Sequence, residues 1–256
     1  MRIEIEDLHK SFGDLTVFDG LNLVVEQGEI CVILGRSGQG KSVLLKHLVG
    51  LLRPDKGSIR IDGKDIVPLA EKELYPYRMR FGMIFQNAGL LQSLNVGENV
   101  ALPLLEVRGR DYHATMKKVA ESLRSVDLEG KERQPVSTLS GGQQKRVAIA
   151  RALLQDADCL LFDEPTAGLD PLISKTVDDI IVQVNRGTGG TCIVVTHDLV
   201  SAFAVGTRIH LLDDGKVAAS GTPEEIRNSD NDIVRRFLAR SLEPEAGRAA
   251  GGANGG

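Results

Sequence analysis

The sequence predicts an α/β fold in which a buried strand leads through a glycine-rich loop into a helix. Three observations predict it. Residues 29–34 form a continuous apolar run, which is typical of a strand covered on both faces. Residues 35–42 fit the spacing G-x-x-x-x-G-K-S, and helical apolar spacing follows them. Two further apolar runs, at 158–163 and 191–195, predict more strands of the same buried sheet.

The N-terminal region predicts an antiparallel β layer. Residues 2–8 and 20–26 alternate apolar and polar side chains with period two, as half-buried strands do. Residues 58–63 add a third short strand that ends in an Asp-Gly turn.

Helical patterns follow the glycine-rich loop and dominate the middle of the chain. The first helix covers residues 40–49, with Gly50 as its C-cap. Helices at 112–126 and 141–154, the second capped by Ser140, predict a helical subdomain of about residues 87–157 inserted into the α/β core. An amphipathic helix with Pro171 in its first turn separates the last two buried strands.

The C-terminal part predicts a hairpin and two helices. Residues 208–212 and 216–220 flank an Asp-Asp-Gly turn, and Thr222 and Pro223 start a short helix as a capping box. A helix at 231–242 carries an apolar face of Ile233, Phe237 and Leu238, which we expect to dock on a protein surface. We expect one domain over residues 1–240 and a flexible tail over 241–256, where apolar residues are too few for folding.

Composition excludes several classes of protein. Hydrophobic residues make up 42% and charged residues 26% of the 256-residue chain, and no apolar run approaches the roughly 18–20 residues of a membrane span. The N-terminus lacks the apolar stretch of a secretory signal. With a net charge of −4, the chain as a whole does not attract the negatively charged phosphate backbone of a nucleic acid. Cys31, Cys159 and Cys192 fall in or beside predicted strands and are expected to be buried structural residues.

The glycine-rich loop and the strand end at residue 163 carry the chemistry of a phosphate site. Glycines in the loop allow bends that turn successive N–H groups inward. Lys41 supplies a positive charge to the β- and γ-phosphates, and the Ser42 hydroxyl can ligate Mg²⁺. Asp163 ends an apolar strand, where its carboxylate is expected to hold the metal through water. Glu164 and His197 also follow strand ends, so both are expected near the γ-phosphate.

With Leu139-Ser-Gly-Gly-Gln143 placed shortly before Asp163-Glu164, and His197 further on, the chain resembles the ATP-binding subunits of ABC transporters over residues 2–242. The resemblance implies a P-loop NTPase (RecA-like) core with an antiparallel β subdomain and an inserted α-helical subdomain. It implies an ATPase that uses ATP and Mg²⁺.

The resemblance also assigns roles to residues. It implies that Glu164 acts as general base, and that Gln86 contacts the metal and the water and begins the segment that faces the membrane partner. The expected catalytic residues are Glu164, His197, Gln86 and Lys41, and the expected Mg²⁺ ligands are Ser42, Gln86 and Asp163. The expected nucleotide contacts are Phe12, which stacks on adenine, and the loop residues Gly35, Arg36, Ser37, Gly38, Gln39, Gly40, Lys41, Ser42 and Val43.

A second set of residues is expected to complete the site from an opposing subunit. Ser140, Gly141 and Gly142 open a helix whose free N–H groups and positive dipole end suit an anion. The resemblance implies that this anion is the γ-phosphate held by the other subunit, with Gln143 and Asp170 nearby. A homodimer with ATP at its interface follows.

Within the family, three stretches resemble the Mla/Mce-type phospholipid-trafficking ATPases: residues 35–52, 81–86 and 228–238. Arg36 in the loop and Val43, where most ABC ATPases have threonine, are the most particular signs. The segment after Gln86 departs from this subgroup, because Leu91 stands where an aromatic is usual. This resemblance implies a permease partner, an Mce-domain lipid-binding protein, and a peripheral location on the cytoplasmic face of the inner membrane.

Three alternatives stay open from the sequence. The first is the ATPase subunit of an importer for amino acids or other polar solutes. The second is a soluble ABC ATPase that acts on ribosomes or DNA, but such proteins usually carry two cassettes or a long coiled coil, and the sequence has neither. The third is a GTPase, and no Asn-Lys-x-Asp motif occurs.

Overall fold

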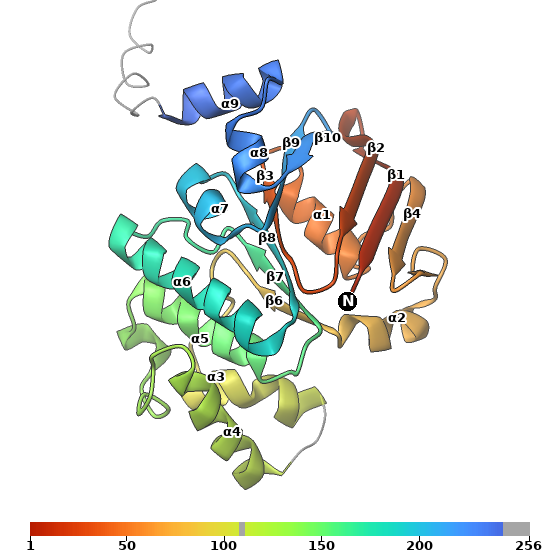
Figure 1. Ribbon diagram of the computed structural model, residues 1–256. Coiled ribbons are helices and arrows are strands. Elements are labelled where there is room, and N and C mark those ends of the chain that lie inside the picture. The colour runs from red at the N-terminus through yellow and green to blue at the C-terminus, as the bar shows by residue number, and fades with distance from the viewer. Residues whose placement is uncertain (108–110, 243–256) are drawn as a thin grey trace, which may run out of the picture.

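The computed structural model describes residues 1–107 and 111–242, and two β-sheets organise them (Figure 1). The smaller sheet is antiparallel, with strand order β2-β1-β4-β5. Its strands are β1 (Ile3–Phe12), β2 (Leu15–Val25), β4 (Lys56–Ile61) and β5 (Lys64–Asp65). The predicted antiparallel β layer is therefore confirmed.

The larger sheet has six strands in the order β10-β9-β3-β8-β7-β6. Its members are β3 (Ile30–Leu34), β6 (Phe81–Ile84), β7 (Cys159–Asp163), β8 (Thr191–Thr196), β9 (Arg208–Asp213) and β10 (Lys216–Gly221). All neighbouring pairs are parallel except the β9–β10 hairpin. Because parallel strands end at the same sheet edge, the residues that follow β3, β7 and β8 meet there.

Helices connect and cover these strands. They are α1 (Lys41–Leu48), α2 (Glu71–Arg78), α3 (Val96–Leu102), α4 (Tyr112–Arg124), α5 (Gly141–Leu153), α6 (Pro171–Thr188), α7 (Leu199–Val205), α8 (Pro223–Arg227) and α9 (Asp232–Leu242), with a π-helical turn at Pro103–Val107 and a 3-10 turn at Val136–Thr138. Sequence patterns did not predict α2, α3 and α7. These are helices of seven or eight residues, and α2 contains Pro76, so none shows a long apolar period.

Two hydrophobic cores lie on opposite faces of the central sheet, and β3 contributes to both. Ile30, Val32 and Leu34 pack in one core, whereas Cys31 and Ile33 pack in the other. Helices α5, α6 and α7 cover the first face, and α1 with the antiparallel sheet covers the second (Figure 1). This two-sided burial explains why residues 29–34 form an unbroken apolar run. The three cysteines are buried, as predicted.

The helices α3, α4 and α5 lie between β6 and β7 in sequence and form the lower part of the molecule in Figure 1. The helices predicted at 112–126 and 141–154 are confirmed as α4 and α5. The division into a domain of residues 1–240 with a helical subdomain of about 87–157 stays a prediction. Most of the predicted tail, residues 243–256, lies outside the described residues.

The apolar face of α9 packs on the chain itself. Val234 and Phe237 are buried in the same core as α5 and α6, with Ile233 and Leu238 partly buried against it. This corrects the expectation that the face docks on another protein, because the chain's own core already covers it. Among the described residues, no helix has the length and apolar character needed to cross a membrane.

Candidate active site

The loop between β3 and α1 needs its glycines for conformation and for space. Gly38 and Gly40 have φ values of 84° and 86°, in the left-handed region that favours glycine. A Cβ at Gly40 would lie 2.5 Å from Val17 Cγ1, and one at Gly35 would lie 2.8 Å from the Leu212 carbonyl oxygen. Larger residues at these positions would therefore displace the loop from the β layer and from β9.

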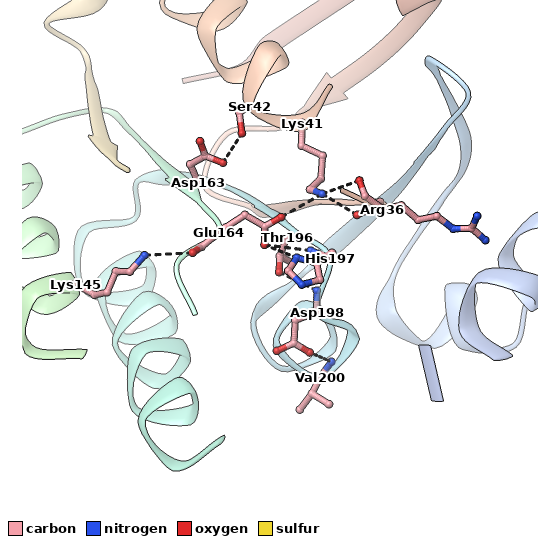
Figure 2. Close-up of polar contacts among 11 residues, drawn as sticks. Arg36, Lys41, Ser42, Lys145, Asp163, Glu164, Thr196, His197, Asp198 and Val200 are labelled. Atoms are coloured by element: carbon pink, nitrogen blue, oxygen red, sulfur yellow. Dashed lines mark hydrogen bonds and ion pairs between the residues drawn. The ribbon is translucent and has the colours of Figure 1, made fainter. Parts of the chain in front are cut away.

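Lys41, the first residue of α1, points its ammonium group back into the loop (Figure 2). Its Nζ donates to the carbonyl oxygens of Gly35 and Arg36, at 2.8 and 3.0 Å. It also lies 3.1 Å from Glu164 Oε1. Lys41 is only 6% exposed, so its buried ammonium group needs these three acceptors. The oxygens of a bound phosphate could take the place of the acceptors.

Ser42 and Asp163 bring two hard oxygen donors together. The Ser42 hydroxyl donates to Asp163 Oδ1 at 2.8 Å. Asp163 is the last residue of β7, so the strand end fixes the direction of its carboxylate. A hydroxyl and a carboxylate are the ligand types that Mg²⁺ prefers, so this pair fits a Mg²⁺ site.

Glu164 is held by its backbone in an unusual conformation. Its φ is 48°, which is strained for a residue with a side chain. Its N–H donates to the Val195 carbonyl oxygen at 2.9 Å, which ties it to β8. His197 Nδ1 lies 2.9 Å from Glu164 Oε2. The carboxylate therefore sits between an ammonium and an imidazole at the edge of the sheet (Figure 2).

Lys145 also contributes to this site, although no sequence pattern singled it out. It lies on α5 and is buried, and its Nζ donates to the carbonyl oxygens of Gln86 and Glu164, the latter at 3.3 Å. Figure 2 shows it approaching Glu164 from the side opposite Lys41. Burial lowers the pKa of Lys145, and Asp163 and Glu164 partly offset this. In the sequence it looks like any helix-surface lysine, so no pattern could have found it.

Three further residues of the predicted site are Gln86, Phe12 and Gln39. The Gln86 side chain is exposed, and the predicted role of that residue rests on its place after β6. Phe12 is 45% exposed at the end of β1, with Lys10 Nζ 5.3 Å from its ring centroid, so it is not a core aromatic. Gln39 accepts a hydrogen bond from the Asp214 N–H at 3.1 Å, which ties the loop to the β9–β10 turn.

The residues expected from an opposing subunit lie at two helix starts. Ser140 caps α5, where it forms a reciprocal capping box with Gln143. Gly141 and Gly142 are the first residues of that helix, and Asp170 caps α6 by accepting from the N–H groups of its second and third residues. These contacts are local to each cap.

The structure thus brings Lys41, Ser42, Asp163, Glu164 and His197 together directly, and links Gln86 to them through Lys145.

A family model described as ABC transporter matches residues 18–167, which include the loop, the Ser140–Gln143 cap and Glu164. The chain belongs to the ABC transporter family. Its relatives agree with this assignment. The probable ribonucleotide transport ATP-binding protein mkl of Mycobacterium leprae is 40% identical over 92% of this chain and 68% of its own length. The methionine import ATP-binding protein MetN of Mesorhizobium japonicum is 37% identical over 95% of this chain and 66% of its own length.

This ABC protein thus spans about two thirds of the length of those curated relatives. Among solved structures, the ATP-binding cassette MJ0796, described as a dimer in a post-hydrolysis state bound to ADP and Pi, superposes with a TM-score of 0.78. It is 34% identical in sequence, and the match covers 86% of this chain and 98% of that cassette. The fold is that of an ABC ATPase cassette, and the chain is an ATP-binding, ATP-hydrolysing cassette of this family.

Proposed function

We propose that this chain is the ATP-hydrolysing subunit of a transporter that moves phospholipid through a partner permease. The observation that carries the ATPase part is the position of the Glu164 carboxylate, 3.1 Å from Lys41 Nζ and 2.9 Å from His197 Nδ1. The cargo rests on the resemblance of residues 35–52, 81–86 and 228–238 to phospholipid-trafficking ATPases.

In this proposal, the phosphates of ATP bind in the glycine loop against Lys41. Ser42 and Asp163, with Gln86 from the loop after β6, would hold Mg²⁺, which when bound neutralises negative charge on the phosphates. The Ser42–Asp163 hydrogen bond of 2.8 Å supports this ligand set, because both oxygens already converge. Phe12, exposed on the β layer, is the proposed adenine platform.

Glu164 is the proposed general base. It accepts the proton of the attacking water, and its strained backbone and the Val195 hydrogen bond hold it at the sheet edge. His197 is proposed to orient Glu164 through Nδ1 and to reach the γ-phosphate through Nε2.

A second copy of the chain would complete each site. The start of α5, with Ser140 as its cap, offers free N–H groups and a positive dipole end for a γ-phosphate bound by the partner copy. Asp170, at the start of α6, would lie in the same interface. The dimer reported for MJ0796 supports this arrangement.

The proposed partners are a membrane permease and an Mce-domain lipid-binding protein, and the proposed location is the cytoplasmic face of the inner membrane.

A second cargo class has specific support. The names of the two relatives refer to ribonucleotide transport and methionine import, which favours a polar solute. The alternative is therefore the ATPase subunit of a polar-solute importer.

Purification of tagged Glu164→Gln protein from its native membranes separates the two cargo classes. Removal of the proposed base should keep ATP bound and the complex closed, so partners remain attached in mild detergent. Mass spectrometry should then find a permease, an Mce-domain protein and bound phospholipid. Recovery of a permease with a polar-solute receptor would reject the phospholipid cargo, and recovery of no membrane protein would reject the transporter role.

A further inference from the structure

Three side chains with metal-binding atoms gather between the two sheets, away from the phosphate loop. They are Glu29, Cys31 and His210, and one ligand atom from each lies within 4.8 Å of the others. Cys31 is four residues before Gly35 on an extended strand, so it lies roughly 13 Å along the chain from the loop, at about 3.3 Å per residue. His210 lies opposite Ile33, roughly 7 Å from Gly35 by the same measure. None of the three is a residue of the candidate ATP site.

The register of two adjacent strands creates this cluster. In the parallel pair of β3 and β9, Cys31 lies opposite Arg208 and Ile33 lies opposite His210. Alternate side chains of a strand share a face, so Cys31 and His210 are diagonal neighbours on the face toward the antiparallel sheet. Glu29, two residues before Cys31, lies on the same side.

His210 is unusual because it is buried without a hydrogen bond. It is 4% exposed, and neither ring nitrogen has a hydrogen-bond partner in the part of the chain that the structure describes. Leaving a buried polar atom unsatisfied costs about 1–3 kcal/mol. A metal ion would give one of these nitrogens a partner, since neutral imidazole is a common metal ligand.

The other two groups also have ligand atoms available. Cys31 is a buried free thiol. One carboxylate oxygen of Glu29 accepts the Glu26 N–H at 2.9 Å, whereas the other lies 3.7 Å from Arg208 Nε, beyond hydrogen-bond distance. A sulfur, an imidazole nitrogen and a carboxylate oxygen form a set typical of Zn²⁺ rather than of Mg²⁺ or Ca²⁺.

We propose that Glu29, Cys31 and His210 bind one Zn²⁺ ion between the central and the antiparallel sheet, independently of nucleotide. Zinc ligands lie about 2.0–2.3 Å from the ion in tetrahedral geometry, which places them about 3.3–3.8 Å from one another. The ligand atoms, which now lie within 4.8 Å of one another, would therefore have to move closer by roughly 1–1.5 Å at most. On binding, a Zn–S bond replaces the S–H bond of Cys31, and the proton leaves to solvent.

Arg208 is the charge that opposes this site. Its guanidinium lies beside Glu29, but its side chain is 43% exposed, so it can turn into water when Glu29 moves to the ion. A thiolate and a carboxylate together balance the charge of Zn²⁺. Removal of the Arg208 charge should therefore tighten metal binding.

The test is a titration of chelator-treated full-length protein with Co²⁺, without nucleotide. A sulfur-to-cobalt charge-transfer band should saturate at one Co²⁺ per chain and disappear when Zn²⁺ is added. The oxygen ligands of the proposed Mg²⁺ site cannot produce this band, so the result is independent of the ATPase proposal. Absence of the band from the wild-type protein would overturn the zinc site, whatever happens to any variant.

Variants locate the site. Cys31→Ser should abolish the band, and His210→Ala should weaken Co²⁺ binding at least tenfold. Cys192→Ser is the matched control, because Cys192 is also a buried thiol on the next strand but packs in the opposite core. It should keep the band, and Arg208→Gln should bind Co²⁺ more tightly. A band that survives Cys31→Ser, or is lost in Cys192→Ser, would contradict the assignment.

Discussion

Lys145 joins two functional segments through one buried ammonium group. Its Nζ donates to the carbonyl oxygens of Gln86, after β6, and Glu164, after β7. The side chain comes from α5, whose first turn carries the predicted trans-acting glycines. A shift of α5 would thus change the hydrogen bonds of Lys145 to Gln86 and to Glu164 together.

Lys145→Met should lower the free energy of unfolding by about 1–3 kcal/mol, because two carbonyl oxygens lose their donor in a water-poor site. Urea denaturation measures this. The matched control is Lys118→Met, which removes an exposed lysine from α4 and should change the unfolding free energy by less than about 0.5 kcal/mol. Equal effects of the two substitutions would show that the buried contacts of Lys145 add no stability.

Asp178 on α6 gives the fold a pH dependence. Burial raises its pKa to about 6, although the Ser201 hydroxyl, which donates to it at 2.5 Å, acts in the opposite direction. In the unfolded chain the pKa is about 3.9. The folded state therefore binds the extra proton between these values, and the contribution of Asp178 to stability is lost as the pH rises through about 6.

Asp178→Asn should stabilise the protein at pH 8 by roughly 2–3 kcal/mol, because an amide carries no charge to bury and keeps an acceptor for Ser201. The gain should shrink as the pH falls toward 5. Unfolding free energies measured across this range, with exposed Asp14→Asn as control, provide the check. A gain that does not change with pH would mean that ionisation of Asp178 is not its source.

At the scale of elements, the start of α5 is fixed by its contact with α6. A Cβ at Gly142 would lie only 2.3 Å from Ile173 Cγ2. Gly142 is therefore needed for helix packing within one subunit, apart from any role toward a partner's phosphate. The same residue thus links the position of α6 to the proposed dimer interface.

Gly142→Ala should destabilise the chain by about 1–3 kcal/mol, since the overpacked methyl group must displace Ile173. Gly141→Ala is the control, because its Cβ would meet only Leu169 Cδ2 at 3.3 Å. The double variant Gly142→Ala, Ile173→Ala should be more stable than the sum of the two single effects predicts, because the shorter side chain at 173 leaves room for the new methyl group. Additive effects in this double-mutant cycle would contradict the close packing.

For the whole molecule, sequence patterns predicted the antiparallel layer, the buried strands and the order of strand, loop and helix. They did so because β3, β7 and β8 are covered on both faces and α6 and α9 have long apolar faces. Short helices such as α3 lacked enough turns to show a period. The contact of Lys145 with Glu164 and the cluster around His210 depend on tertiary register, which no local pattern specifies.

We propose Glu164 as the base of an ATPase whose sites are completed by two copies of the chain. The most direct measurement is steady-state ATP turnover of wild type and Glu164→Gln, with sedimentation analysis of both in ATP and Mg²⁺. Glu129→Gln, a change at an exposed carboxylate paired with Arg124, is the control. We predict that Glu164→Gln slows turnover by about 10²–10⁴-fold and accumulates an ATP-bound dimer. Turnover equal to wild type, or a protein that stays monomeric with ATP bound, would contradict the account.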